Sequence, residues 1–126
     1  MPTKILIIED NPANHELVEY LLKAAGYAAL SAWDGVEGMR MVQEKHPDLI
    51  LCDLQMPKMN GYEVIQQLKA DVQLRHIPVV AVTASSMSGD STKAIAAGFD
   101  GYISKPIEPE TFIQQIEEFL APRLRA

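Results

Sequence analysis

Five short apolar runs that alternate with longer amphipathic segments place the strongest constraint on the fold of this chain. The apolar runs cover residues 5–8, 27–32, 49–52, 77–82 and 101–104. The segments between and after them repeat apolar residues with the 3.6-residue period of a helix. These segments cover residues 12–25, 35–45, 61–70, 88–97 and 109–120. Strands that alternate with helices over short connections predict an α/β fold, with a parallel sheet covered by helices on both faces.

The composition of the runs also predicts their order in the sheet. Residues 5–8, 49–52 and 79–82 are continuously apolar, as expected for strands that are covered on both faces. The other two runs are weaker and fit edge strands. With right-handed crossovers, we expect a doubly wound, five-stranded parallel sheet of order 2-1-3-4-5, flanked by five helices. Residues suited to helix C-caps and helix starts stand at the expected boundaries: Gly26 and Gly98, and Pro12 and Pro109.

Length and composition limit the class of protein. The chain fits one domain, residues 1–126, that ends in a short tail at 121–126. A net charge of −6 disfavours direct binding to nucleic acid. No apolar stretch matches a signal peptide or the ~20 residues of a membrane span. Cys52, the only cysteine, lies in an apolar run and indicates an inert core thiol in a reducing compartment. We therefore expect a cytoplasmic protein with no membrane or nucleic-acid partner.

Carboxylates follow two strands that the expected order makes neighbours. Glu9 and Asp10 end the first apolar run, and Asp53 ends the third. Ligands of doubly wound sheets bind beyond the carboxyl ends of the strands, where the strand order reverses, so the three side chains should converge. At ~4 Å and an effective dielectric constant near 20, each like-charge pair costs about 4 kcal/mol. The cluster therefore calls for a proton or a cation, and its oxygen ligands suit Mg²⁺, with Mn²⁺ as a substitute.

Two more polar side chains are expected at the same edge. Thr83 follows the fourth strand and Lys105 the fifth. An aspartate nucleophile needs a metal to neutralise the incoming phosphate oxygens, and a lysine and a hydroxyl can bind the others. Each residue by itself would fit a cap, a turn or a solvated charge. Their joint occurrence at four strand ends predicts phosphoryl transfer to Asp53, with an acyl phosphate as product.

The motifs around these residues extend over residues 4–120. They read IIEDN at 7–11, DLILCDLQMP at 48–57, MNG at 59–61, PVVAVTA at 78–84 and AGFDGYISKP at 97–106. This set resembles the receiver domain of two-component response regulators, the CheY-like fold. The EDNPAN start at 9–14 and the YISKPI ending at 102–107 are most similar to stand-alone single-domain receivers of the DivK type and to receiver modules of hybrid kinases.

The resemblance implies roles for the residues at the strand ends. Asp53 would be the phosphoacceptor, and Glu9 and Asp10 would hold Mg²⁺ together with it, one of them partly through water. Lys105 would contact the phosphate, and its peptide bond to Pro106 would be cis, an isomer largely confined to proline.

Four further roles follow from the same resemblance. The backbone carbonyl of Gln55 would be a further metal ligand, while the side chains of Gln55 and Ser85 would set how fast water attacks the acyl phosphate. Thr83 would move toward the phosphate, and Tyr102 would rotate inward behind it. The phosphoryl group would in this way bias a two-state switch.

The function implied is that of a single-domain response regulator, a phosphoacceptor that catalyses at most its own phosphorylation and dephosphorylation. A histidine kinase or a histidine phosphotransfer protein would supply the phosphoryl group. Since no output domain follows Leu120, the output would be a protein partner that reads the face made by the fourth helix, fifth strand and fifth helix. An alternative is a phosphorelay shuttle that passes phosphate to a histidine phosphotransfer domain.

Two other classes fit less well. A Mg²⁺-dependent aspartyl phosphatase of the haloacid-dehalogenase type wants a second aspartate where Gln55 stands. A flavodoxin-like cofactor carrier needs a phosphate-cradling loop after the first strand, where Glu9 and Asp10 would repel phosphate.

Three histidines and the tryptophan have no role in the function described above. His15, His46 and His76 are isolated and lack metal-ligand spacing, so we expect solvated or capping positions for them. Trp33 lies just past the second strand, beside the expected metal site. We expect it to pack on the surface, with shielding of the site, or reporting on it by fluorescence, as the alternative.

Overall fold

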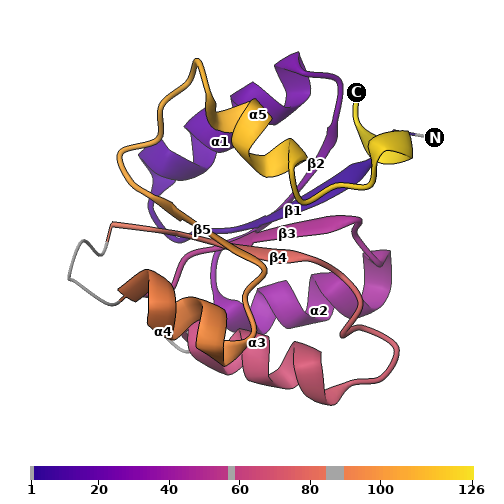
Figure 1. Ribbon diagram of the computed structural model, residues 1–126, viewed down its shortest axis with the longest axis vertical. Coiled ribbons are helices and arrows are strands. Elements are labelled where there is room, and N and C mark those ends of the chain that lie inside the picture. The colour runs from indigo at the N-terminus through magenta and orange to yellow at the C-terminus, as the bar shows by residue number, and fades with distance from the viewer. Residues whose placement is uncertain (1, 57–58, 85–89) are drawn as a thin grey trace.

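The computed structural model describes residues 2–56, 59–84 and 90–126 and shows a parallel sheet between two layers of helices (Figure 1). The strands are β1 (Lys4–Ile8), β2 (Ala28–Ala32), β3 (Leu49–Cys52), β4 (Val79–Thr83) and β5 (Gly101–Ser104). The helices are α1 (Pro12–Ala24), α2 (Gly35–Lys45), α3 (Gly61–Ala70), α4 (Asp90–Ala97) and α5 (Phe112–Glu117), followed by the 3₁₀ helix η1 (Pro122–Leu124). The strand order is β2-β1-β3-β4-β5, which confirms the expected doubly wound topology.

The helices divide between the two faces of the sheet. In Figure 1, α1 and α5 lie on one face, and α2, α3 and α4 lie on the other. Successive residues of a strand point to opposite faces, so each central strand contributes to two cores. Leu6 and Ile50, for example, belong to the core under α2, α3 and α4, while Ile7 and Leu51 belong to the core under α1 and α5. The central strands β1, β3 and β4 are almost wholly buried and the edge strands are not, as their composition predicted.

Helix boundaries follow the capping residues at most positions. Asn11 caps α1 by accepting a hydrogen bond from the backbone N–H of Asn14, and Pro12 is the first helical residue. Gly26 and Gly98 follow α1 and α4 with positive φ angles of 95° and 120°, the region that glycine occupies without a steric penalty. The expected C-cap glycines and the expected proline start of α1 are thus confirmed.

Most of the described boundaries lie within one residue of the expected ones, but those of the fourth strand and the last helix differ by more. The fourth strand begins at Val79 and not at residue 77, because Ile77 donates its N–H to Leu74 in the preceding turn and Pro78 has no N–H to give. The last helix was expected over 109–120 but spans only Phe112–Glu117. Pro109 therefore precedes α5 by a turn and does not begin it.

The tail at 121–126 is held against the start of the sheet. It contains η1, and the Leu124 carbonyl accepts a 2.6 Å hydrogen bond from the Thr3 hydroxyl. The backbone N–H of Ala126 donates to the Tyr27 hydroxyl over 3.0 Å. Across the described part of the chain, no helix combines the length and apolar character needed to cross a membrane.

Candidate functional site

Three carboxylates converge at the carboxyl ends of β1 and β3. Ile8 pairs with Cys52 in the parallel register, so the residues that follow, Glu9 and Asp53, lie side by side. The backbone N–H of Asp53 donates to the Ile8 carbonyl over 3.0 Å and continues the ladder by one residue. Carboxylate oxygens of Glu9, Asp10 and Asp53 all lie within 4.8 Å of one another. Glu9 and Asp53 are buried, whereas Asp10 is exposed to solvent.

Lys105 enters this cluster from the end of β5. Its backbone N–H donates to the Thr83 carbonyl over 2.9 Å, so the backbone of Lys105 is still bonded to the end of β4. The ammonium then donates to Glu9 Oε1 at 2.5 Å and to Asp53 Oδ2 at 3.1 Å. The Lys105 side chain is only 9% exposed. Its peptide bond to Pro106 is cis, the isomer that the resemblance implied.

The charges of the site are not balanced. Burial raises the pKa of Glu9 to about 7, and the neighbouring Asp53 carboxylate raises it as well, although the hydrogen bond from Lys105 lowers it. Burial by itself would lower the pKa of Lys105, but the bond to Glu9 and the Asp53 charge outweigh it and raise that pKa. One ammonium therefore leaves the three carboxylates short of positive charge, and Glu9 takes up a proton more readily than an ordinary glutamate.

A hard divalent cation fits this shortage. The site offers carboxylate oxygens from three residues, the donors that Mg²⁺ prefers, and Asp10 keeps one side open to water. Gln55 follows Asp53 by two residues, and its backbone N–H donates to Asp53 Oδ1 over 3.1 Å. Glu9, Asp10 and Asp53 are thus the described residues that can hold such an ion.

The space enclosed beneath the carboxylates is small. A void of about 10 Å³ is lined by Glu9, Asp53 and apolar side chains that include Val18 and Val82. That volume is at the lower limit for a single water molecule. A ligand of Asp53 therefore has to bind on the solvent side of the carboxylates, where Asp10 is exposed.

The two residues expected to act as a switch lie on neighbouring strands. Thr83 ends β4 and is fully buried, and it pairs with Ser104 of β5. Tyr102 is half-buried, pairs with Ala81 and packs against the core under α2, α3 and α4. Ser85, which was expected to tune the lifetime of the acyl phosphate, lies outside the described residues.

The expectation for His15 is wrong. This side chain is 2% exposed, and its Nδ1 atom lies 2.9 Å from the Glu9 backbone carbonyl. Its ring stacks on Trp33, with centroids 3.9 Å apart and an interplanar angle of 11°. His15, Val18 and Leu22 are the buried residues of α1, and their spacing of three and seven is a helical core pattern. Counting His15 into that apolar face would have found it.

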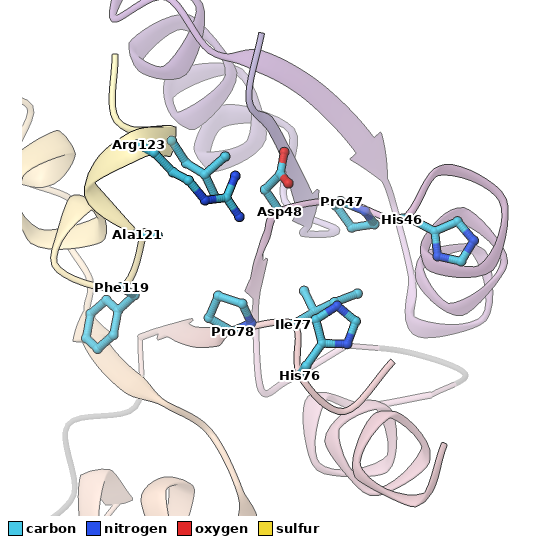
Figure 2. A pocket seen from close by; sticks show the side chains of 10 residues that line it. His46, Pro47, Asp48, His76, Ile77, Pro78, Phe119, Ala121 and Arg123 are labelled. Carbon is cyan, nitrogen blue, oxygen red and sulfur yellow. The ribbon is translucent and has the colours of Figure 1, made fainter. Parts of the chain in front are cut away.

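His46 and His76 lie at the other end of the sheet, near the amino ends of β3 and β4, and both are exposed as expected. His46 is the C-cap of α2 with a φ angle of 47°. Both histidines line a cavity of about 450 Å³ before the starts of β3 and β4. Figure 2 shows His46 and Phe119 at opposite sides of this cavity, with the guanidinium of Arg123 near Asp48 between them. Among the described residues, the one cluster of three metal-ligating side chains is at Asp53 and contains neither histidine.

Comparison with known proteins identifies relatives over nearly the whole chain. The family model of the response regulator receiver domain matches residues 5–117. The polar-differentiation response regulator DivK of Brucella ovis is 44% identical over 120 residues, which are 95% of this chain and 98% of that protein.

Solved structures of other proteins share this fold. The chemotaxis protein CheY4 of Vibrio cholerae superposes with a TM-score of 0.88 at 28% identity, over 95% of this chain and 100% of that one. The receiver domain of the sensor histidine kinase PA1611 of Pseudomonas aeruginosa gives a TM-score of 0.86 at 28% identity, over 94% and 98% of the two chains. In that structure a magnesium ion is coordinated in the active-site cleft.

Proposed function

Since the chain belongs to the response regulator receiver domain family, we propose that Asp53 is its phosphoacceptor and takes a phosphoryl group from a phosphohistidine. As a receiver, the protein is a signalling component of a two-component system, and its upstream partner is a histidine kinase, directly or through a histidine phosphotransfer protein. The observation that carries the assignment is the position of Asp53, a buried carboxylate bonded to Lys105 and grouped with Glu9 and Asp10.

The transfer requires little covalent machinery from the protein. An oxygen of Asp53 attacks the phosphorus atom while the bond from phosphorus to the imidazole nitrogen breaks, and the electron pair of that bond stays with the imidazole. The product is an acyl phosphate on Asp53. Lys105 is held within 3.1 Å of Asp53 Oδ2 and can pass from that oxygen to a phosphoryl oxygen.

Magnesium is the cofactor that the site fits. Glu9, Asp10 and Asp53 would hold the ion, with the backbone carbonyl of Gln55 as a further ligand, and Mn²⁺ would substitute for it. The bound ion would neutralise the phosphoryl oxygens during transfer. The magnesium ion in the PA1611 receiver domain and the three convergent carboxylates of this chain support the assignment.

The output proposed for the site is a change in the face made by α4, β5 and α5. Thr83 would turn toward the phosphoryl group and Tyr102 would move inward behind it, and a protein partner would bind the face in one of its two states. The pairing of β4 with β5 next to both residues supports a coupled movement. Ile95 of α4, an apolar side chain that is 50% exposed, is suited to contact with a partner.

The lifetime of the acyl phosphate would depend on residues beside Asp53. Gln55 is exposed two positions after Asp53, so its side chain can lie between the phosphoryl group and incoming water. Ser85, two positions after Thr83 in the sequence, would be the second such residue, as the resemblance implied.

The phosphoacceptor is tested with acetyl phosphate and Mg²⁺. Wild-type protein should gain one phosphoryl group per chain, visible by intact mass, stable in acid and labile in base. Asp53→Asn should gain none. Asp48→Asn is the matched control, because Asp48 lies just before β3, at the end of that strand opposite to Asp53. It accepts a hydrogen bond from the Lys4 N–H, which an asparagine oxygen can also accept. Phosphorylation of Asp53→Asn at the wild-type level would refute the assignment.

A further inference from the structure

Among the described residues, the buried His15 of α1 makes one side-chain hydrogen bond, and its acceptor belongs to Glu9, one of the three residues whose carboxylates converge. The His15 Nδ1–H donates to the Glu9 backbone carbonyl over 2.9 Å. A carbonyl oxygen only accepts, which assigns the proton to Nδ1. The buried Nε2 atom has no hydrogen-bond partner within residues 2–56, 59–84 and 90–126. The orientation of the ring therefore depends on Glu9 at the Nδ1 side and on packing elsewhere.

The helix backbone and the Trp33 side chain together hold the imidazole of His15 in place. The backbone N–H of His15 donates to the Asn11 carbonyl over 2.9 Å, which fixes the residue in the first turns of α1. The indole of Trp33 stacks on the imidazole, 3.9 Å between centroids. Trp33 is itself tied to α2, because its backbone N–H donates to Glu37 Oε1 over 2.9 Å. The imidazole is thus a fixed donor and not a mobile side chain.

The carbonyl that His15 holds controls where Asp10 lies. The Glu9 carbonyl belongs to the planar peptide that joins Glu9 to Asp10, so fixing the direction of that oxygen fixes the peptide plane. The N–H of Glu9 is already held by the Ala32 carbonyl at 3.1 Å. With both backbone groups of Glu9 bonded, the chain leaves β1 in one direction.

A fixed direction matters because the carboxylates repel one another. Three of them meet within 4.8 Å, and a turn of the Glu9–Asp10 peptide would carry Asp10 away from Asp53. Asp10 is exposed, so packing does little to keep it in place. We propose that His15 is a positioning residue whose Nδ1–H keeps the Glu9–Asp10 peptide oriented so that both carboxylates can hold the divalent cation. The inference rests on the proposed function.

Two substitutions of His15 distinguish the effect of its Nδ1–H donor from the effect of ring packing. His15→Phe keeps an aromatic ring that can stack on Trp33 but has no donor for the Glu9 carbonyl. His15→Asn loses the ring but places its amide N–H₂ near the position of Nδ1. Leu22→Val is the control, because Leu22 is buried in the same helix and its truncation loosens α1 without touching Glu9.

The readout is the affinity for a divalent cation, measured with Mn²⁺ by electron paramagnetic resonance of the free ion. We expect His15→Phe to weaken Mn²⁺ binding about tenfold, the lower end of the effect of losing a group that orients a metal ligand. His15→Asn should retain most of the wild-type affinity, and Leu22→Val should retain all of it.

A second readout uses Trp33, the only tryptophan in the chain. Its emission should change as Mg²⁺ is titrated into the wild type, because the ring on which it stacks is bonded to the peptide between two metal ligands. In His15→Phe the stack remains but that connection is cut, so the Mg²⁺-dependent change should shrink.

The outcomes distinguish the inference from the function on which it rests. Wild-type affinity in His15→Phe, or equal losses in His15→Phe and His15→Asn, would overturn the role of the Nδ1–H while leaving the phosphoacceptor intact. If His15→Phe does not fold, a tenfold loss in a folded His15→Asn overturns it as well. Failure of the wild type to bind Mn²⁺ or Mg²⁺ would overturn both the inference and the metal site of the proposed function.

Discussion

The raised pKa of Glu9 predicts an unusual dependence of stability on pH in the absence of metal. Burial is the main cause that takes this pKa from an ordinary 4.5 to about 7 in the folded protein. The difference corresponds to about 3 kcal/mol, because each pH unit between the folded and unfolded pKa is worth about 1.4 kcal/mol. Glu9 is 5% exposed, so solvent screening reduces this figure little.

The sign follows from proton binding. Between pH 4.5 and about 7 the folded state holds a proton on Glu9 that the unfolded state has released. The folded state binds more protons there, so the free energy of unfolding must fall as pH rises. The contribution is complete below pH 4.5 and is lost above about 7. Lys105, whose pKa is raised, stays charged throughout and adds no slope in this range.

Urea unfolding in EDTA at several values between pH 5 and 8 measures the effect. Glu9→Gln is the reference, since it keeps the shape of the side chain but cannot ionise. The wild type should lose about 2–3 kcal/mol relative to Glu9→Gln between pH 5 and 8. The comparison isolates the contribution of Glu9, because the two proteins differ only at that residue.

Mg²⁺ should offset much of this loss. The ion binds ionised Glu9, so at pH 8 a concentration of 100 times the Kd at that pH should stabilise the fold by about 2.7 kcal/mol, and the same concentration should stabilise it less at pH 5. Parallel curves for the wild type and Glu9→Gln in EDTA would refute the reasoning, because they would mean that Glu9 ionises equally in the folded and unfolded states.

Two further predictions concern the neighbours of Glu9 and Asp53. Lys105→Met removes the ammonium bonded to both carboxylates and should lower the free energy of unfolding by about 3 kcal/mol in EDTA, as measured by chemical denaturation. Added Mg²⁺ should restore much of this free energy. Gly61→Ala would place a Cβ atom 2.5 Å from the Asp53 carbonyl oxygen and 2.8 Å from the Leu54 Cα. It should cost about 1–3 kcal/mol in thermal unfolding and slow the reaction with acetyl phosphate, because the backbone beneath Asp53 must shift.

The convergence of the carboxylates could be predicted from the sequence because parallel strands impose it. Once β1 and β3 are neighbours, the residues after Ile8 and Cys52 must meet at one edge, whatever the details of the helices. Lys105 followed in the same way from the position of β5 beside β4. Such placements depend on the strand order, which the composition of the strands and the right-handedness of the crossover connections together predict.

Helical periodicity could have predicted that His15 is buried, but not what its side chain contacts. Its role depends on a hydrogen bond to a backbone carbonyl and on a stacking partner 18 residues away, and neither has a period or a motif in the sequence. The boundaries of α5 were misjudged for a similar reason. The apolar spacing of Phe112, Ile116 and Leu120 is helical, and all three are buried, but the N–H groups of Phe119 and Leu120 bond three residues back in a tighter turn. Periodicity predicts the buried face and not the hydrogen bonds at its ends.

The balance of charge explains why the site should respond to metal and phosphate together. Glu9, Asp10 and Asp53 contribute three formal negative charges against the one positive charge of Lys105. Phosphorylation of Asp53 would neutralise the carboxylate but add a phosphoryl group with a charge of about −1.5 to −2, so the shortage of positive charge would grow. It would also weaken the charge on the carboxylate oxygen to which Lys105 is bonded, which frees the ammonium for the phosphoryl group. A divalent cation offsets the remainder. Binding of the metal and phosphorylation of Asp53 should therefore favour each other, since each reduces the electrostatic cost of the other.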